Sequence, residues 1–127
     1  MRNFRTLDVW KNGVVLAQKI YEIAQSLPHQ EKFGLCSQMM RAAVSIPANI
    51  AEGASRRSEN DFARFLEIAI GSAFELETHL IIAKEIGYLE NQHVDGLLQE
   101  LGYLQRKANS LLSKIRGRPS QRPITNG

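Results

Sequence analysis

Apolar residues recur along this chain at alternating spacings of three and four, which is the pattern of one face of an α-helix. The pattern runs through four segments, residues 7–25, 31–50, 59–86 and 91–116. The fourth segment is the most regular, because its aliphatic residues keep a heptad repeat without a break. Short connections separate the segments, and none of them shows the strict alternation of a strand. The sequence therefore predicts an all-α fold, an antiparallel up-down four-helix bundle.

Residues that start or stop helices mark the ends of these segments. We expect Thr6 to cap the first helix, and Ser58, with an acidic residue three positions on, to cap the third. Gly87 follows the third helix, where a glycine is the usual terminator. Pro47 lies inside the second segment, so we expect a kink or a restart there, with Ser45 capping the new turn.

Two further stretches of the bundle stand out. A run of small residues around Gly71 lies in the middle of the third helix, where a glycine costs about 1 kcal/mol against alanine. We therefore expect a neighbouring backbone to pack closely there, because such packing would offset that cost. Residues 41–53 mix small residues, a proline and isolated polar groups in an apolar context, and buried polar groups need partners. We therefore expect a structural network of polar side chains from this block and the third helix. They are Arg41, Asn49, Glu52, Glu75 and Glu77.

The length of 127 residues fits one domain with its own core. We assign residues 1–117 to the bundle and residues 118–127 to a basic, flexible tail, because the last ten are polar and contain two prolines. No stretch reaches the roughly 20 apolar residues that span a membrane, and no signal peptide is predicted. The single cysteine, Cys36, cannot form an internal disulfide, which agrees with a cytoplasmic location.

Charge is strongly segregated along the chain, although the net charge is only +3. Residues 1–57 hold eight basic and four acidic side chains. Residues 58–100 hold two basic and nine acidic side chains, and residues 101–127 hold six basic side chains and no acidic one. Such blocks indicate surfaces with opposite preferences for partners. The alternative is that the oppositely charged segments lie side by side in the fold or in an oligomer.

Patterns of catalytic or metal-binding residues are not found. A di-iron bundle needs two Glu-x-x-His pairs and two further glutamates, and only Glu90 and His93 have that spacing. One cysteine and three scattered histidines do not make a structural zinc site. Cys36 is expected to be a small core residue, and His79 a surface or interface residue. We therefore predict no enzymatic activity, no catalytic residues, no metal and no cofactor.

A set of short motifs, spread over most of the chain, resembles one bacterial family. They are Val9-Trp10, Tyr21, Pro28, Glu31, Phe33-Gly34-Leu35, Gln38, residues 41–53, Arg57-Ser58, Asp61-Phe62, Phe65-Leu66, Ile68-Ala69, Gly71-Ser72 and Glu75-Leu76-Glu77-Thr78. In these motifs the chain resembles the four-helix-bundle proteins of large-subunit ribosomal RNA intervening sequences, which are often mislabelled as a ribosomal protein. The similarity extends from Phe4 to about Ile115. Met39-Met40 departs from the family's more usual Leu-Arg type pair, which weakens any basic groove at that point.

The resemblance implies a ring-forming homo-oligomer, with five subunits as the expected number. It also implies kinship with the accessory variability proteins of diversity-generating retroelements. Those proteins are pentameric bundles that work with a reverse transcriptase and bind nucleic acid. The family has no established enzymatic activity, so the resemblance implies no catalytic residue.

Basic side chains are therefore the candidates for function, as contacts to the backbone of RNA or DNA. They are Arg56, Arg57, Arg106, Lys107, Lys114, Arg116, Arg118 and Arg122. Phosphate contacts are salt-sensitive and poorly sequence-specific, and the sequence offers neither a recognition-helix motif nor an aromatic platform for bases. Part of the charge of Lys114 and Arg116 also stabilises the end of the fourth helix. The alternative function is a protein-only adaptor that holds a partner, such as a reverse transcriptase, without touching nucleic acid.

Overall fold

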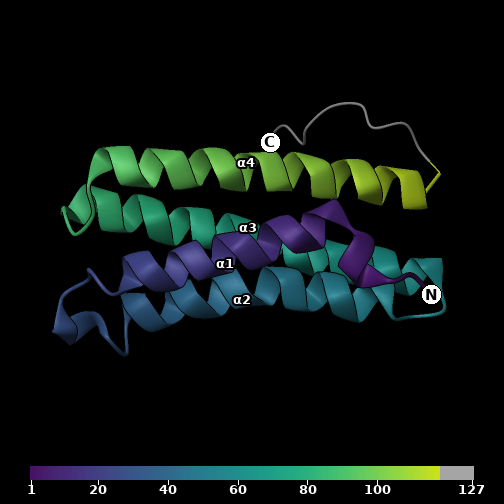
Figure 1. Ribbon diagram of the computed structural model, residues 1–127, viewed down its shortest axis with the longest axis horizontal. Helices are drawn as coiled ribbons and strands as arrows, with labels where there is room; N and C mark the ends of the chain where they lie inside the picture. The colour runs from purple at the N-terminus through teal and green to yellow at the C-terminus, as the bar shows by residue number, and fades with distance from the viewer. Residues whose placement is uncertain (118–127) are drawn as a thin grey trace.

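The computed structural model describes residues 1–117, and four α-helices account for most of them. Helix α1 spans Asp8–Ala24, α2 Leu35–Ala54, α3 Glu59–Ile86 and α4 Asn91–Ile115. Two short 3-10 helices, η1 at Phe4–Thr6 and η2 at His29–Glu31, precede α1 and α2. The described residues contain no strand. Successive helices run up and down one long axis (Figure 1), so the predicted all-α four-helix bundle is confirmed.

The predicted bounds of α3 are confirmed at both ends, because its capping residues act as expected. The Ser58 hydroxyl accepts a hydrogen bond from the N–H of Asp61 at 3.2 Å, and Gly87 adopts a left-handed φ of 94°. Helix α4 begins at Asn91 as predicted and ends at Ile115, one residue early.

The starts of α1 and α2 differ from the prediction because of the short turns before them. Thr6 belongs to η1, where its hydroxyl donates to the Asn3 carbonyl at 2.8 Å. Leu7 takes the N-cap position of α1 and makes no side-chain hydrogen bond. Glu31 belongs to η2, and its carboxylate accepts the N–H of Leu35 at 3.2 Å. Helix α2 therefore begins four residues later than predicted.

Pro47 does not break α2, which continues as one helix from Leu35 to Ala54. The buried proline ring packs against Gly13 of α1, where an added Cβ would lie 3.2 Å from the Cβ of Pro47. The glycine leaves room for the ring, so α1 covers the turn of α2 that lacks a backbone donor. Ser45 caps no new turn, because its hydroxyl lies 2.8 Å from that of Ser72 on α3. The predicted restart is wrong.

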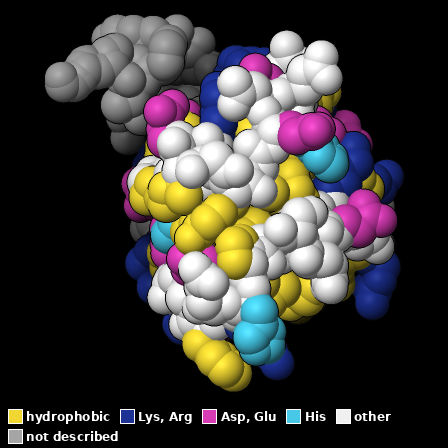
Figure 2. Space-filling view, turned by 90° about the vertical axis from the view of Figure 1, so that its left-hand side faces the viewer, with side chains coloured by type: hydrophobic (Ala, Val, Ile, Leu, Met, Phe, Trp, Pro, Cys, Tyr) yellow, Lys and Arg dark blue, Asp and Glu magenta, His cyan; other side chains and the backbone are white. Residues whose placement is uncertain are grey.

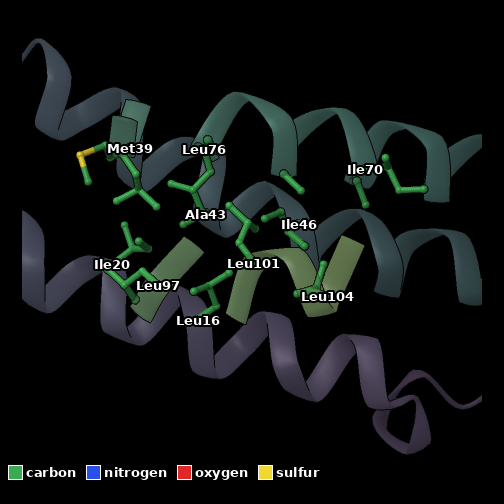
Figure 3. Close-up of a cluster of buried hydrophobic side chains, with 14 of the residues drawn as sticks. Leu16, Ile20, Met39, Ala43, Ile46, Ile70, Leu76, Leu97, Leu101 and Leu104 are labelled. Carbon is green, nitrogen blue, oxygen red and sulfur yellow. The ribbon is translucent and has the colours of Figure 1, made fainter. Parts of the chain in front are cut away.

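All four helices contribute to one hydrophobic core (Figure 3). The central side chains are Leu16 and Ile20 of α1, Met39 and Ile46 of α2, Leu76 of α3, and Leu101 and Leu104 of α4. Each of these has at most 1% of its surface exposed. Burial of one such side chain contributes about 1.5–3 kcal/mol, so a core of this size stabilises the bundle without a disulfide. Phe65 of α3 and Leu111 and Ile115 of α4, which continue the inward-facing apolar positions of their helices, are only partly buried.

Gly71 does not have the predicted packing role within the chain. Within residues 1–117, an added Cβ at Gly71 would meet no atom within 4 Å, although the neighbouring Ser72 and Ala73 are buried. Close approach occurs instead at Gly53 of α2, where an added Cβ would lie 2.7 Å from the Cβ of Phe65. Helices α2 and α3 therefore pack closely near the connection that joins them.

Candidate nucleic-acid interface

The up-down topology brings basic segments that are far apart in the sequence to one end of the bundle (Figure 1). The N-terminus, the connection between α2 and α3, and the last turns of α4 all lie there. The half of the bundle at this end, residues 1–16, 45–72 and 103–117, holds ten basic and five acidic side chains. The other half, residues 17–44 and 73–102, holds four basic and eight acidic side chains. We call these halves the basic end and the acidic end.

The tip of the acidic end faces the viewer in Figure 2 and has a mixed surface. Hydrophobic side chains are exposed in its centre, while lysine and arginine side chains lie at its edges. A polyanion that approaches this tip meets no concentrated positive field. The candidate interface is therefore at the opposite end of the bundle.

A surface hollow of about 370 Å³ lies at the basic end, between the start of α1 and the later turns of α4. Part of its lining is apolar, from Leu7, Val9 and Leu111, and part is cationic. The cations are Arg106, Lys107 and Lys114, all from α4. The N-terminus of α1 adds the positive end of its helix dipole. The hollow thus combines positive charge with apolar surface.

Lys107 is the cation whose surroundings are best defined. Its Nζ donates to Oδ2 of Asp8 at 3.4 Å and lies 5.3 Å from the centroid of the Tyr103 ring. The Tyr103 hydroxyl and the Asp8 carboxylate raise the pKa of Lys107 above its usual value, so the amine is charged at physiological pH. Asp8 also lines the hollow and places one negative charge beside its three cations.

Three of the predicted contacts are open to a phosphate. Arg57, Arg106 and Lys114 are exposed, and in the described part of the chain none of them forms an ion pair. Arg106 and Lys114 line the hollow, whereas Arg57 lies in the connection between α2 and α3. Arg118 and Arg122 lie outside the described residues.

Two other predicted contacts, Arg56 and Arg116, already have a carboxylate neighbour. Arg56 lies 2.6 Å from Glu52, and Arg116 of the α4 terminus lies 2.9 Å from Glu67 of α3. The hydrogen bond from Arg116 lowers the pKa of Glu67 and raises that of Arg116. Both arginines are therefore less available to a ligand than Arg106.

The polar network predicted for residues 41–53 is only partly present. Asn49 donates to the carbonyl and the hydroxyl of Ser45, at 2.8 and 2.9 Å, within α2. Arg41, Glu52 and Glu75 are exposed, so the predicted buried contacts among them are wrong for the chain alone. The reason is the helix period, which turns position 41 away from the buried positions 39, 42, 43 and 46.

The two glutamates of α3 in that prediction have other partners. Glu75 lies 3.4 Å from His79, one turn later on the same helix. Glu77 accepts a hydrogen bond from Gln105 of α4 at 3.1 Å. They therefore stabilise the surface of α3 and its contact with α4, and neither reaches residues 41–53.

Tyr103 and Asp8 line the hollow of the candidate interface, but neither was predicted from the sequence, where no aromatic platform was recognised. Tyr103 is 48% exposed and stands beside the cations of α4. Its spacing of four from Lys107 is a signal that the sequence does contain, because residues four apart share a helix face. Asp8 meets Lys107 only through the packing of α1 on α4, and no local pattern indicates that pair.

The groups considered for catalysis or metal binding have ordinary structural surroundings. In residues 1–117, no three His, Cys, Asp or Glu side chains gather as a possible metal-ligand set. Cys36 is half-buried, and its thiol lies 3.6 Å from the carbonyl oxygen of Ala24. None of the helices in this part of the chain is long and apolar enough to cross a membrane.

A family model described as 23S rRNA-intervening sequence protein matches residues 5–110. The chain belongs to this family. The resemblance seen in the sequence is thereby confirmed. A crystal structure at 1.70 Å of a protein of unknown function, from the S23 ribosomal protein family of Bacteroides thetaiotaomicron, has a similar fold. The TM-score is 0.77 and the identity 24%, over 83% of this chain and 95% of that chain, and at this identity the similarity shows the fold alone. No curated protein matches the chain.

Proposed function

We propose that this member of the 23S rRNA intervening-sequence family is a non-enzymatic, homo-oligomeric scaffold that binds the backbone of RNA or DNA through its basic end. The observation that carries the proposal is the gathering of ten basic side chains in one half of the bundle. Among them, Arg106 and Lys114 stand exposed at a hollow, and neither is in an ion pair with another described residue.

Phosphate contacts of this kind depend on salt and carry little sequence information. Each phosphate that is neutralised releases counterions, so the logarithm of the binding constant falls with log salt by about 0.9 per contact on duplex DNA and about 0.7 on single strands. Arg57, Arg106 and Lys114 offer three such contacts per subunit. The side chains that pair with carboxylates are expected to add less, because a phosphate has to displace the partner.

The oligomer is favoured by the outer face of α3, where large apolar side chains are exposed. Ile68, Phe74, Ile81, Ile82 and Ile86 are each 40–56% exposed. Gly71 lies on the same face, and no contact with the rest of residues 1–117 explains a glycine there. A helix from a second subunit would cover the apolar side chains and would come close at Gly71, which repays its cost of about 1 kcal/mol.

A second apolar hollow, of about 470 Å³, lies between α1 and α2. Its lining includes Val14, Ala17, Tyr21, Val44 and Pro47. Two different apolar faces on one chain favour head-to-tail contacts, in which one face of each subunit meets the other face of the next. Such contacts form a ring when the rotation from one subunit to the next closes. We propose five subunits, the number that the family resemblance implies. A ring of any size would bring several basic ends together.

The same apolar faces favour a second candidate, a protein-only adaptor. In that case α3 or the hollow between α1 and α2 holds a different protein, and the basic end contributes only solubility. A reverse transcriptase is the partner that the retroelement kinship implies for either function. The two candidates differ in one property, which is whether the protein alone binds nucleic acid.

Binding of a structured RNA of unrelated sequence, measured by fluorescence anisotropy across a salt series, separates the two candidates. The test variant is Arg106→Gln with Lys114→Gln. The matched control is Lys32→Gln with Arg41→Gln, which removes the same charge from exposed positions at the acidic end. The proposal expects weaker binding and a shallower salt slope in the test variant, by about 0.7–0.9 per lost contact.

The control is expected to bind almost as well as the parent, because its charges lie at the other end of the bundle. Equal losses in the two variants would mean that only net charge matters. If the parent binds no RNA even at low salt, the protein-only adaptor takes the place of the proposal. Light scattering in parallel tests the oligomer, and a mass near that of the 14.3 kDa chain at micromolar concentration would refute it.

A further inference from the structure

We propose that the hollow at the basic end seats an unpaired nucleobase against the ring of Tyr103, so that the protein prefers single-stranded nucleic acid to duplex. The inference rests on the proposed function and names its ligand more narrowly. Backbone binding needs only the cations, whereas this inference assigns a contact to the base itself.

Tyr103 stands where a ligand can reach its ring. Its side chain lines the hollow that holds Arg106, Lys107 and Lys114. It also lines a neighbouring hollow of about 320 Å³, likewise between α1 and α4, next to Val15 and Gln99. The ring is 48% exposed and stands between the two hollows. It is therefore open to a ligand, whereas the core residues of α4 face inward.

The surroundings of the Tyr103 ring are cationic. The Nζ of Lys107 lies 5.3 Å from the ring centroid, so a cation already occupies one side of the aromatic group. Aromatic rings flanked by cations are the usual platform for bases of single strands, because every base has a flat face that stacks regardless of sequence. Arg106 and Lys114 are eight positions apart on α4, about 12 Å along the helix. Both follow Tyr103 along α4, so they can hold phosphates of the strand on one side of a base that stacks on its ring.

The hollow beside Tyr103 is the right size for one nucleotide. A hollow of about 370 Å³ is near the lower end of the range of small-molecule sites, about 300–1,000 Å³. It has room for a nucleotide with one face against Tyr103. A base inside a duplex has both faces covered by its neighbours and cannot enter. A duplex is then left with phosphate contacts alone.

A carboxylate restricts where the backbone of the bound strand can lie. Glu100 lines the hollow of about 320 Å³ and forms an ion pair with Lys19 at 2.8 Å. A phosphate there would meet a carboxylate, so the backbone of the strand is expected to stay on the side of Arg106 and Lys114. The base then points along the seam toward Tyr103. Each subunit therefore contacts a short stretch of strand.

The test compares two oligonucleotides of equal charge, a twelve-residue oligothymidylate and a twelve-residue deoxyribose-phosphate chain without bases. Affinities are measured by competition against a labelled oligothymidylate at low salt. The parent is expected to bind the oligothymidylate at least about fivefold more tightly, the lower limit for one base stacked on an aromatic side chain. Tyr103→Leu should lose this preference and keep its affinity for the chain without bases. Tyr103→Phe should retain the preference, because the ring remains.

Phe33→Leu is the matched control, since Phe33 is also an exposed aromatic with a cation beside it, Lys32 at 5.4 Å from the ring centroid, but lies at the acidic end. It should behave as the parent. Oligouridylate of the same length gives the RNA arm. Both single strands should depend on Tyr103, and the one bound more tightly identifies the nucleic acid.

Equal binding of the two oligonucleotides by the parent, or an undiminished preference in Tyr103→Leu, overturns the inference and leaves backbone binding intact. Failure of the parent to bind either oligonucleotide or the structured RNA removes the proposed function and the inference together. The comparison of the two oligonucleotides uses the unaltered protein, so it stands even if a variant folds poorly.

Discussion

Replacing Asp8 by Asn should weaken the fold and strengthen nucleic-acid binding at the same time. Asp8 is the first residue of α1, and its carboxylate lies 3.4 Å from the amine of Lys107 at the edge of the cationic hollow. The substitution keeps the shape of the side chain and removes its charge. Lys107 is then released from its ion pair, and an incoming phosphate no longer meets a negative charge.

The two effects can be estimated separately. An exposed ion pair contributes up to about 1 kcal/mol, and an acidic residue in the first turn of a helix about 0.3–1 kcal/mol. Since the two side chains are 67% and 36% exposed, solvent screens their attraction, and we expect the variant to lose mainly the helix-terminus contribution of Asp8, about 0.3–1 kcal/mol of unfolding free energy. A phosphate about 6 Å from the carboxylate is repelled by about 0.7 kcal/mol in water, so the affinity should rise about threefold.

The assay is urea unfolding for stability and anisotropy at low salt for RNA affinity. Asp95→Asn is the control, because Asp95 pairs with Lys84 at 3.0 Å at the acidic end and the charge change is the same. The control should lose stability without a comparable gain in affinity. If Asp8→Asn leaves affinity unchanged, or if both variants gain equally, the hollow beside α1 is not where phosphate binds.

Four further substitutions test the packing and the oligomer. Gly71→Ala should favour the helix by about 1 kcal/mol in a lone chain but reduce the oligomer mass in light scattering, if a neighbour packs there. Gly53→Ala should lower the unfolding free energy in urea by about 1–3 kcal/mol, because its Cβ has no room. Arg41→Ala should change it by less than about 0.5 kcal/mol, since Arg41 is exposed. Glu67→Gln removes the pair with Arg116, which lowers the pKa of Glu67. The stabilisation from that pair is present above the ordinary pKa of 4.5 and is lost as pH falls through the lowered one, so the deficit of the variant should shrink between pH 5 and pH 3.

The parts of the fold that could be predicted are those fixed by local sequence. The cap at Ser58 and the left-handed Gly87 gave α3 its bounds, because both act within one turn of the helix end. The restart at Pro47 was predicted wrongly because its partner, Gly13, is distant in sequence and belongs to another helix. The start of α2 was missed because Glu31 serves a 3-10 turn and caps the following helix from outside.

In the candidate interface, too, local features could be predicted and contacts between distant segments could not. The basic residues of α4 could be predicted from composition, and their meeting with Arg57 follows from the up-down order of the helices. The hollow itself depends on how α1 lies against α4, so Asp8 could not be placed beside Lys107 in advance. The error at Arg41 was avoidable, since the helix period alone turns that position outward.

Photo-crosslinking of the parent protein to a single-stranded RNA that carries 4-thiouridine, followed by mass spectrometry of the peptides, locates the bound strand without any substitution. If the basic end binds nucleic acid, the crosslinks should fall on peptides around Asp8 and Tyr103–Lys114, and they should disappear at high salt. Crosslinks concentrated on residues 81–93 at the acidic end, or crosslinks that persist unchanged at high salt, would contradict the account.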